Sequence, residues 1–502
     1  MINEYEVRDL IESPPSTEAA ELLDYSIAAQ MAVLPLERKD DRLLIAMTNP
    51  QNYQLIGDLQ TITGLFVEPV IAKEEDIRYH LNQLYGKANI ENIASQFLVD
   101  ENIRKNQYQL NAELRSQIQN APTVQLVDSL IESAALRRAS DIHIEPLENG
   151  LQTRFRIDGR LTGRQTVNIG LLPNVISRLK IMAGMNIAEK RLPQDGHFSL
   201  HIHDEPIDFR LSTLPTIYGE KAVIRLLYGH HERLSIQDLG FYEDDLEKLD
   251  KLFKSPYGAV IITGPTGSGK STTLTGFLSE LNDGSINIVT VEDPVENPIQ
   301  GINHVAVDPK AGLDFPRALR HILRQDPDII MVGEIRDSDT ASIAMQAAIT
   351  GHLVLSTLHT NDASGVFPRL VDMGVEPFMV AASLNGVIAQ RLVRRLCPLC
   401  KEKTTISHTE AHLLSLAELT EIYTANGCNN CGNTGYKGRF AIYEYIILND
   451  NIRQEMAASN YDPVQVSAIM KQNSGSMLEN GIARVLAGDT SAKELIRVVF
   501  RE

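Results

Sequence analysis

The sequence predicts a multidomain α/β protein whose largest domain holds a mostly parallel sheet. Its 502 residues suffice for three or four domains, and 43% hydrophobic with 22% charged residues is ordinary globular composition. From about residue 239, strand-like runs at 259–263, 288–291, 329–332 and 353–356 alternate with helical patterns. That alternation is typical of a parallel sheet with helices on both faces, and a phosphate-binding motif follows the first of these runs.

Residues 1–87 are predicted to form a small N-terminal α/β domain. Its expected elements, in chain order, are a helix at 18–32, strands at 33–37 and 43–47, a helix at 56–63, a strand at 65–71 and a helix that opens at 74–76. This stretch contains no catalytic constellation. We therefore expect a docking domain, and the alternative is a domain that merely adds stability.

Residues 88–120, rich in Asn, Gln, Glu and Lys, are predicted to be a polar linker. A second α/β domain is expected over 121–233. Its apolar spacing predicts a helix at 124–138, and alternating patterns predict strands at 141–145, 153–157, 208–214 and 221–227. Asp158-Gly159, directly after the second of these strands, is a turn pair that suits a hairpin.

The phosphate-binding motif of the third domain, 234–502, is complete. Gly264-Pro265-Thr266-Gly267-Ser268-Gly269-Lys270-Ser271 matches G-x-x-x-x-G-K-[ST], and it lies between a strand and a helix that begins with Ser271 and Thr272. The glycines let backbone N–H groups surround phosphates, and the helix N-terminus adds partial positive charge. We expect Lys270 to contact the β and γ phosphates of ATP and the Ser271 hydroxyl to occupy one Mg²⁺ position.

Two other predicted strands end in carboxylates. One ends at Glu334, and another ends at Glu292 with Glu296 four residues later. Because ligands bind beyond the carboxyl ends of parallel strands, these side chains should face the phosphates. We expect Glu334 to organise Mg²⁺ or the attacking water, with the other acids as candidates for accepting its proton. The alternative is that these acids are merely solvated at strand ends.

A histidine-containing segment, Thr350–Asn361, is expected at the same edge of the sheet. His359 follows its strand and could donate a hydrogen bond to a γ-phosphate, whereas a lone histidine such as His352 more often packs or faces water. An arginine cluster lies nearby, and we expect some of its members to be structural ion-pair partners of Asp326, Asp328 or Asp337, while for any single one function and structure are equal alternatives. Its members are Arg317, Arg320, Arg324 and Arg336.

All four cysteines lie in two C-x-x-C pairs within residues 396–433. The pairs are Cys397 with Cys400 and Cys428 with Cys431. Four thiolates so spaced are typical of a closed, structural Zn²⁺ site, while so few cysteines exclude a disulfide scaffold and favour a reducing compartment. Free buried thiols are the alternative. Zinc would order an arm able to contact a partner.

These motifs together resemble the secretion ATPase superfamily. The segments that carry the resemblance are 264–271, 291–296, 332–337 and 351–361, and it extends from about residue 120 to the C-terminus. It implies a RecA-like ATPase domain over 234–502, preceded by a PAS-like second domain. It also implies that Glu296 and Glu334 are catalytic or Mg²⁺-organising acids, that Glu292 supports them, and that His359 senses phosphate.

The resemblance further implies a homohexamer with ATP held between the two domains of a subunit. Arg210 and Arg225 resemble arginines that the second domain lays on the γ-phosphate, with residues 231–235 as a hinge. The cysteine module is similar to one in type II secretion and pilus-extension ATPases. We therefore expect a motor for type II pseudopilus assembly and protein export, with type IV pilus extension as the alternative. Its N-terminal domain would dock on the cytoplasmic domain of an inner-membrane platform protein.

Charge, composition and hydropathy bear on the alternative functions and on the location of the protein. A net charge of −18 and the lack of tryptophan argue against a nucleic-acid translocase, whose pore would be basic and aromatic. A non-enzymatic scaffold would not need both Glu296 and Glu334. The first residues lack a signal-peptide pattern, and no apolar run approaches the ~18 residues that span a bilayer. We expect a cytoplasmic protein, peripheral to the inner membrane, that contacts the membrane through partners and binds no nucleic acid directly.

Overall fold

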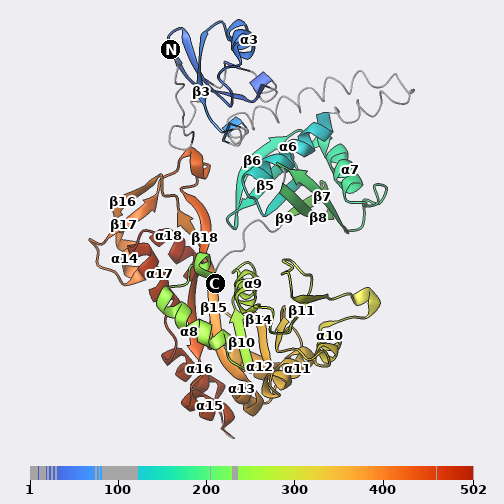
Figure 1. Ribbon diagram of the computed structural model, residues 1–502, viewed down its shortest axis with the longest axis vertical. Coiled ribbons are helices and arrows are strands. Elements are labelled where there is room, and N and C mark those ends of the chain that lie inside the picture. Colours follow the sequence, from blue (N-terminus) through green and yellow to red (C-terminus); the bar gives the residue numbers. More distant parts are fainter. Residues whose placement is uncertain are drawn as a thin grey trace. The chain divides into compact units, whose positions relative to one another are not determined.

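The computed structural model separates into two compact units, residues 1–229 and 230–502 (Figure 1). It describes residues 10, 19, 22–23, 27–28, 31–73, 76–77, 80–81, 122–203, 205–228, 236–458 and 461–500. The linker at 88–120, the hinge at 231–235 and most of the helices expected at 18–32 and from 74 lie outside these residues. In the described part of the chain, no helix is both long enough and apolar enough to cross a membrane.

The N-terminal part of the first unit is a three-stranded sheet with one described helix joining two of its strands. β1 (Val33–Lys39) pairs antiparallel with β2 (Arg42–Met47), and β3 (Phe66–Ile71) runs parallel to β2. The connecting helix α3 (Tyr53–Thr63) begins where the Asn52 side chain accepts the N–H of Leu55. The predicted α/β character of this domain is therefore confirmed for its described residues.

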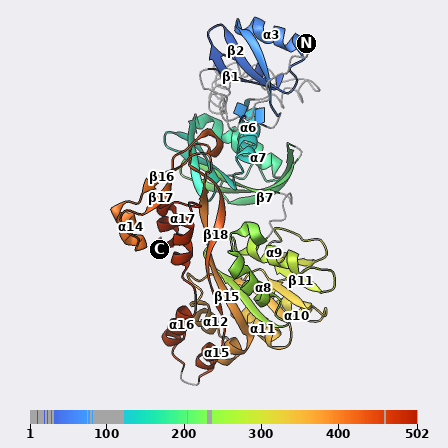
Figure 2. The same cartoon turned by 60° about the vertical axis from the view of Figure 1, so that its left-hand side comes forward.

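The second part of the first unit is a six-stranded antiparallel sheet in the order β6-β5-β4-β9-β8-β7. Its strands are β4 (Asp141–Leu147), β5 (Gly150–Ile157), β6 (Arg160–Val167), β7 (Gln194–Ile202), β8 (Glu205–Thr216) and β9 (Gly219–Tyr228). Helices α6 (Pro122–Leu136) and α7 (Leu172–Met182) share a hydrophobic core with the sheet (Figures 1 and 2). Asp158 and Gly159 adopt positive φ in the turn between β5 and β6, as predicted.

The second unit is built on a seven-stranded sheet in the order β12-β11-β13-β14-β10-β15-β18, in which only β18 runs antiparallel to its neighbour. The strands are β10 (Gly258–Thr263), β11 (Ile288–Glu292), β12 (Asn303–Ala306), β13 (Ile329–Val332), β14 (Leu353–Leu358), β15 (Leu384–Leu396) and β18 (Tyr436–Ile447). β10 is buried along its whole length. Continuous burial is what a strand covered on both faces requires.

Helices cover both faces of this sheet. Ala259 and Ile261 of β10 share one core with α10 (Phe315–Ile322), α11 (Ser338–Ile349), α12 (Val366–Asp372) and α13 (Pro377–Ser383). Val260 and Ile262, pointing to the other face, share a second core with α8 (Glu243–Phe253) and α9 (Lys270–Leu281). The predicted mostly parallel sheet with helices on both faces is therefore confirmed.

The C-terminal part extends the sheet and adds a small subdomain to it. β15 and β18 pair from Gly386–Ile447 to Leu396–Tyr436, and the two-stranded sheet of β16 (Lys401–Thr405) and β17 (Glu421–Ala425) lies between them in sequence. Among the described residues, five α-helices complete this part, and Figure 2 shows α14 and α17 beside β16 and β17. They are α14 (His408–Leu414), α15 (Asp450–Ala457), α16 (Pro463–Gln472), α17 (Met477–Leu486) and α18 (Ala492–Val499).

Candidate nucleotide site and metal centre

The phosphate-binding loop connects β10 to α9, as predicted. Gly264 and Gly269 have φ values of 144° and 86°, which favour glycine strongly. A Cβ at Gly264 would lie 2.4 Å from the carbonyl oxygen of Gln390, and one at Gly269 would lie 2.9 Å from Gln390 Nε2. Both glycines are thus required by backbone conformation and by the close approach of β15.

Lys270 lies at the first turn of α9 with its ammonium over the loop. Its Nζ donates to the carbonyl oxygens of Gly264 at 2.9 Å and Pro265 at 3.2 Å. The side chain is buried, and this burial lowers the pKa of Lys270, while the negative charge of Glu334 acts in the opposite direction. The loop lysine and the strand-end carboxylate therefore interact electrostatically. The neighbouring residues Pro265, Thr266, Gly267 and Ser271 are exposed, whereas Ser268 is buried and Thr272 half-buried.

Gln390 on β15 clamps the loop, and sequence reasoning missed it. The side chain is 1% exposed. Its Nε2 donates to the Ser268 carbonyl oxygen at 2.8 Å, and its Oε1 accepts from Thr273 Oγ1 at 3.0 Å. A glutamine directly after the apolar run Val387–Ala389 was the signal that could have revealed it, because a buried amide needs partners of its own.

Glu334, two residues beyond β13, is the centre of a polar cluster at the carboxyl edge of the sheet. Its carboxylate lies 2.5 Å from Arg336 Nη2 and 3.5 Å from His359 Nε2, while Arg336 Nη1 is 4.0 Å from Asp293. Glu334 is 17% exposed, whereas His359 and Arg336 are 48% and 61% exposed, so the carboxylate is shielded and its partners face solvent. The structure thus brings together Lys270, Glu334 and His359, as expected for residues at the carboxyl ends of parallel strands.

The arginine cluster is paired differently from the sequence prediction. Among the described residues, none of its members forms an ion pair with Asp326, Asp328 or Asp337, so that expectation is wrong. Asp337 instead caps α11 by accepting from Thr340 N at 2.8 Å, and Asp328 accepts from Asn287 N at 2.7 Å. Three of the four arginines have other partners: Arg320 pairs with Asp339, Arg336 with Glu334 and Asp293, and Arg317 donates to the Gly312 carbonyl.

Glu292, the last residue of β11, and Glu296, which follows the strand, occupy different environments. Glu292 Oε1 accepts from Thr290 Oγ1 at 2.7 Å and lies 2.9 Å from His304 Nδ1. His304 Nε2 accepts a backbone N–H, so in the neutral ring the proton lies on Nδ1 and is donated to Glu292. Glu296 is exposed and has no hydrogen-bond or ion-pair partner among the described residues. Glu292 is thus tied into its strand end, and Glu296 is free to reorient.

His352 lies at the other end of β14 from His359. Its Nδ1 is 3.0 Å from the carbonyl oxygen of Ala347, at the end of α11. It is therefore a packing histidine, remote from the carboxyl edge where His359 lies.

Arg210 and Arg225 are neighbours on the first unit's antiparallel sheet. They are opposite each other in β8 and β9 and line an open cavity of about 720 Å³. Asp141, which is buried, accepts from Arg225 Nε at 3.1 Å and lies 3.3 Å from Arg156 Nε. Asp141, which the sequence reasoning missed, fixes the root of an arginine whose side chain is still 61% exposed.

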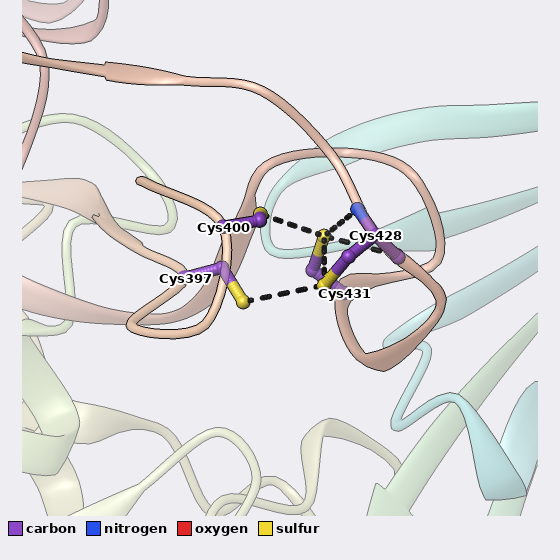
Figure 3. A group of neighbouring side chains, drawn as sticks. All are labelled: Cys397, Cys400, Cys428 and Cys431. Carbon is purple, nitrogen blue, oxygen red and sulfur yellow. Dashed lines mark hydrogen bonds between the residues drawn. The ribbon is translucent and has the colours of Figure 1, made fainter. Parts of the chain in front are cut away.

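The four cysteines converge as a candidate metal centre (Figure 3). Their sulfur atoms all lie within 4.8 Å of one another. Three of the separations are 3.8 Å: Cys397 to Cys428, Cys400 to Cys431, and Cys428 to Cys431. A tetrahedron with Zn–S bonds of about 2.3 Å has edges of about 3.8 Å, so the donor set fits a Zn²⁺ ion.

The thiols of this centre differ in acidity. Burial raises the pKa of Cys431, but backbone N–H groups of Cys428 and Gly435 donate to its sulfur and lower the pKa to about 7. Burial and the neighbouring thiols raise the pKa of Cys400 to about 12. A cation would be needed to hold all four groups as thiolates, which is the role of a structural metal.

Comparison with known proteins places these features in a family. The model of the type II/IV secretion system protein family matches residues 116–497, and the MshEN domain model matches residues 3–90. The type IV pilus assembly ATPase PilB of Thermus thermophilus is 43% identical over 98% of this chain, which spans 56% of that protein. Type II secretion system protein E of Pectobacterium carotovorum is 40% identical over 97% of this chain and 98% of its own length. The corresponding protein of Dickeya dadantii is 46% identical over 76% of this chain and 77% of its own length.

Solved structures agree at the level of the fold. The ATPase DotB of Legionella pneumophila has a TM-score of 0.55 and 21% identity, covering 74% of this chain and 94% of DotB. DotB of Yersinia pseudotuberculosis has the same TM-score and 20% identity, covering 79% of this chain and 96% of its own. With a family model spanning most of the chain and relatives of 40–46% identity, this chain belongs to the type II/IV secretion system protein family and is an ATPase.

Proposed function

We propose that this chain is an ATP-hydrolysing motor that works as a homohexamer and powers assembly of a type II secretion pseudopilus, and with it protein export. The observation that carries the proposal is the convergence of Lys270, Glu334 and His359 at one edge of the motor sheet. Phosphoryl transfer depends on positioning and on neutralising charge, and a loop lysine beside a carboxylate and an imidazole provides for both. The relatives named type IV pilus assembly ATPase PilB and type II secretion system protein E support the same activity.

In the proposed site, residues 264–272 bind the phosphates of ATP. The Ser271 hydroxyl and the Glu334 carboxylate hold Mg²⁺, which when bound neutralises charge on the β and γ phosphates. Glu334 also orients the attacking water, and the exposed Glu296 is the second candidate for accepting its proton. Glu292 supports the strand end through His304, and His359 donates to the γ-phosphate.

Arg210 and Arg225 are proposed to neutralise the γ-phosphate charge in the ATP-bound motor. A guanidinium is permanently charged and offers several donors in a fixed plane, which suits phosphate oxygens. Arg225 is held at its Nε by Asp141, so its terminal nitrogens remain available. Similar arginines contribute roughly 10³–10⁵ in rate in other NTPases.

The remaining parts of the proposal concern partners. Zn²⁺ held by Cys397, Cys400, Cys428 and Cys431 orders the β16–β17 subdomain as a structural element. The N-terminal domain, which matches the MshEN model, docks on the cytoplasmic domain of an inner-membrane platform protein. The motor would thus be cytoplasmic and peripheral to the inner membrane. It would contact the membrane through that partner and bind no nucleic acid directly.

Type IV pilus extension is the second candidate function. The observation that favours it is that PilB of Thermus thermophilus matches 98% of this chain at 43% identity, and PilB of Myxococcus xanthus matches 95% at 40%. Both functions use the same ATP chemistry. They differ in the filament that the platform protein assembles.

Lys270→Ala tests the proposed function in purified protein and in cells. The substitution removes the charge that faces the phosphates but keeps the backbone loop, so ATP binding and phosphate release should both be lost. Lys251→Ala is the matched control, because that lysine is 74% exposed on α8. In the producing strain, Lys270→Ala should abolish either export of secreted proteins or surface pili, and the missing phenotype identifies the filament. Wild-type ATP turnover in Lys270→Ala would refute the proposal.

A further inference from the structure

The loop after β14 carries His359 and is anchored residue by residue. Immediately after the histidine, Thr360 N donates to Thr263 Oγ1 at 2.8 Å, and the two threonine hydroxyls are 2.7 Å apart. Thr263 is the last residue of β10, so this contact joins the histidine loop to the strand that leads into the phosphate-binding loop. The place of the half-exposed imidazole therefore depends on the backbone that follows it.

Two side chains from the sheet's outer strands hold the next residues of this loop. Arg391 of β15 donates through Nη2 to the Asn361 carbonyl oxygen at 3.0 Å. Glu444 of β18 accepts through Oε1 from Ala363 N at 3.0 Å. Ala363 is fully buried, so its N–H would lose its partner without gaining water if the carboxylate were removed.

The second oxygen of Glu444 lies at the start of a C-terminal helix. Glu444 Oε2 accepts from the N–H of Met477, the first residue of α17, at 3.4 Å. A carboxylate is favoured at a helix N-terminus. Arg391 provides a positive charge near Glu444. Burial lowers the pKa of Arg391, and the carboxylates of Glu444 and Asp362 act in the opposite direction. One carboxylate thus bridges the histidine loop and α17, and it uses both oxygens to do so.

We propose that Glu444 is a positioning residue for His359, which fixes the loop after β14 so that the imidazole stays beside Glu334 and the γ-phosphate. The proposal rests on the role given to His359 in the proposed function. A carboxylate that only stabilised the fold would lower the melting temperature when replaced, but its effect on turnover would not depend on His359. That difference makes the two roles separable.

Glu444→Gln in the full chain is the first test. The amide has the same shape, but it has one acceptor oxygen for two N–H groups and turns a donor toward one of them. We expect kcat to fall by about tenfold to a hundredfold with KM for MgATP changed less than about threefold, because a misplaced contact to the transferring group weakens the transition state more than binding. Tyr445→Phe is the matched control: it removes a 2.8 Å hydrogen bond to Asp245 from the next residue of β18 and should leave kcat within about twofold.

A double-mutant cycle with His359→Ala decides the matter. If Glu444 acts through the imidazole, Glu444→Gln should cost little further turnover once His359 is absent, and Arg391→Met, which frees the Asn361 carbonyl, should behave in the same way. The preference for ATP over ADP in equilibrium titrations should fall both in Glu444→Gln and in His359→Ala. Equal losses in both backgrounds, or an unchanged ATP preference, would overturn the positioning role. Absence of ATP turnover in the wild type would instead refute the proposed function, and the binding titrations would still test Glu444.

Discussion

Replacing Gln390 should weaken ATP binding although the side chain contacts no phosphate. In the wild type, its amide holds the Ser268 carbonyl at 2.8 Å and accepts from Thr273 at 3.0 Å, in a site that is 1% exposed. Gln390→Ala orphans both buried groups, and each orphan costs about 1–3 kcal/mol. The cost of the unpaired Ser268 carbonyl falls on the phosphate-binding loop, because the loop must still reach the conformation that accepts phosphates. This cost of about 1–3 kcal/mol corresponds to roughly a 5- to 150-fold higher Kd for ATP.

Equilibrium titration of the purified variant with ATP measures this effect, beside thermal unfolding without nucleotide. Gln390→Glu should be weaker still, because it sets a carboxylate oxygen against the Ser268 carbonyl. Asn385→Ala, near the start of β15, is the control. It loses a hydrogen bond to Tyr257 and one from Arg453, so it should lower the melting temperature and leave the Kd unchanged. A Kd for Gln390→Ala equal to that of the wild type would refute the role of the Gln390 amide in holding the phosphate-binding loop.

Three other expectations concern the metal centre, a buried ion cluster and the arginine face. Elemental analysis should find about one zinc per chain, and Cys397→Ser with Cys428→Ser should release it while ATP binding persists; full zinc content in that variant would place the metal elsewhere. Burial raises the pKa of Glu494, but hydrogen bonds from Arg497 and Arg394 outweigh it and lower the pKa to about 2, below the ordinary 4.5. Because the folded-state pKa is depressed, this group contributes about 3 kcal/mol of stability above pH 4.5 that is lost as pH falls toward 2, and acid unfolding of Glu494→Gln should lack that slope. Arg225→Ala should bind ATP almost normally and lose roughly 10³-fold in turnover even in fused hexamers, whereas unchanged turnover would exclude its proposed contact with the γ-phosphate.

The parts of the site that could be predicted from the sequence depend on residues that are close to one another in the chain. The phosphate-binding loop is identified by eight consecutive residues, and its place between β10 and α9 follows from the pattern around it. Glu334 and His359 each follow an apolar strand, and parallel strands bring their carboxyl ends to one edge. The rule on sheet edges was therefore enough to predict that Lys270, Glu334 and His359 converge.

The parts that it missed depend on pairing between distant strands. Gln390 and Glu444 act on loops that precede them by more than 80 residues in sequence, and their strands β15 and β18 were not among those predicted. Side-chain partners were also beyond reach: Asp328 and Asp337 bond backbone N–H groups rather than arginines. Spacing along a chain predicts which edge a residue occupies, but it does not predict which neighbour completes its hydrogen bonds.

Single-turnover phosphate release in Glu334→Gln tests most directly whether the carboxyl edge of this sheet hydrolyses ATP. The amide keeps the shape of the side chain beside Lys270 and His359 and removes the charge that would hold Mg²⁺ and orient water. We predict that ATP remains bound with a Kd within about threefold of the wild type, while phosphate release falls by about a hundredfold or more. Glu296→Gln, measured in parallel, shows whether the exposed acid shares the proton transfer. Phosphate release from Glu334→Gln at the wild-type rate would contradict the account.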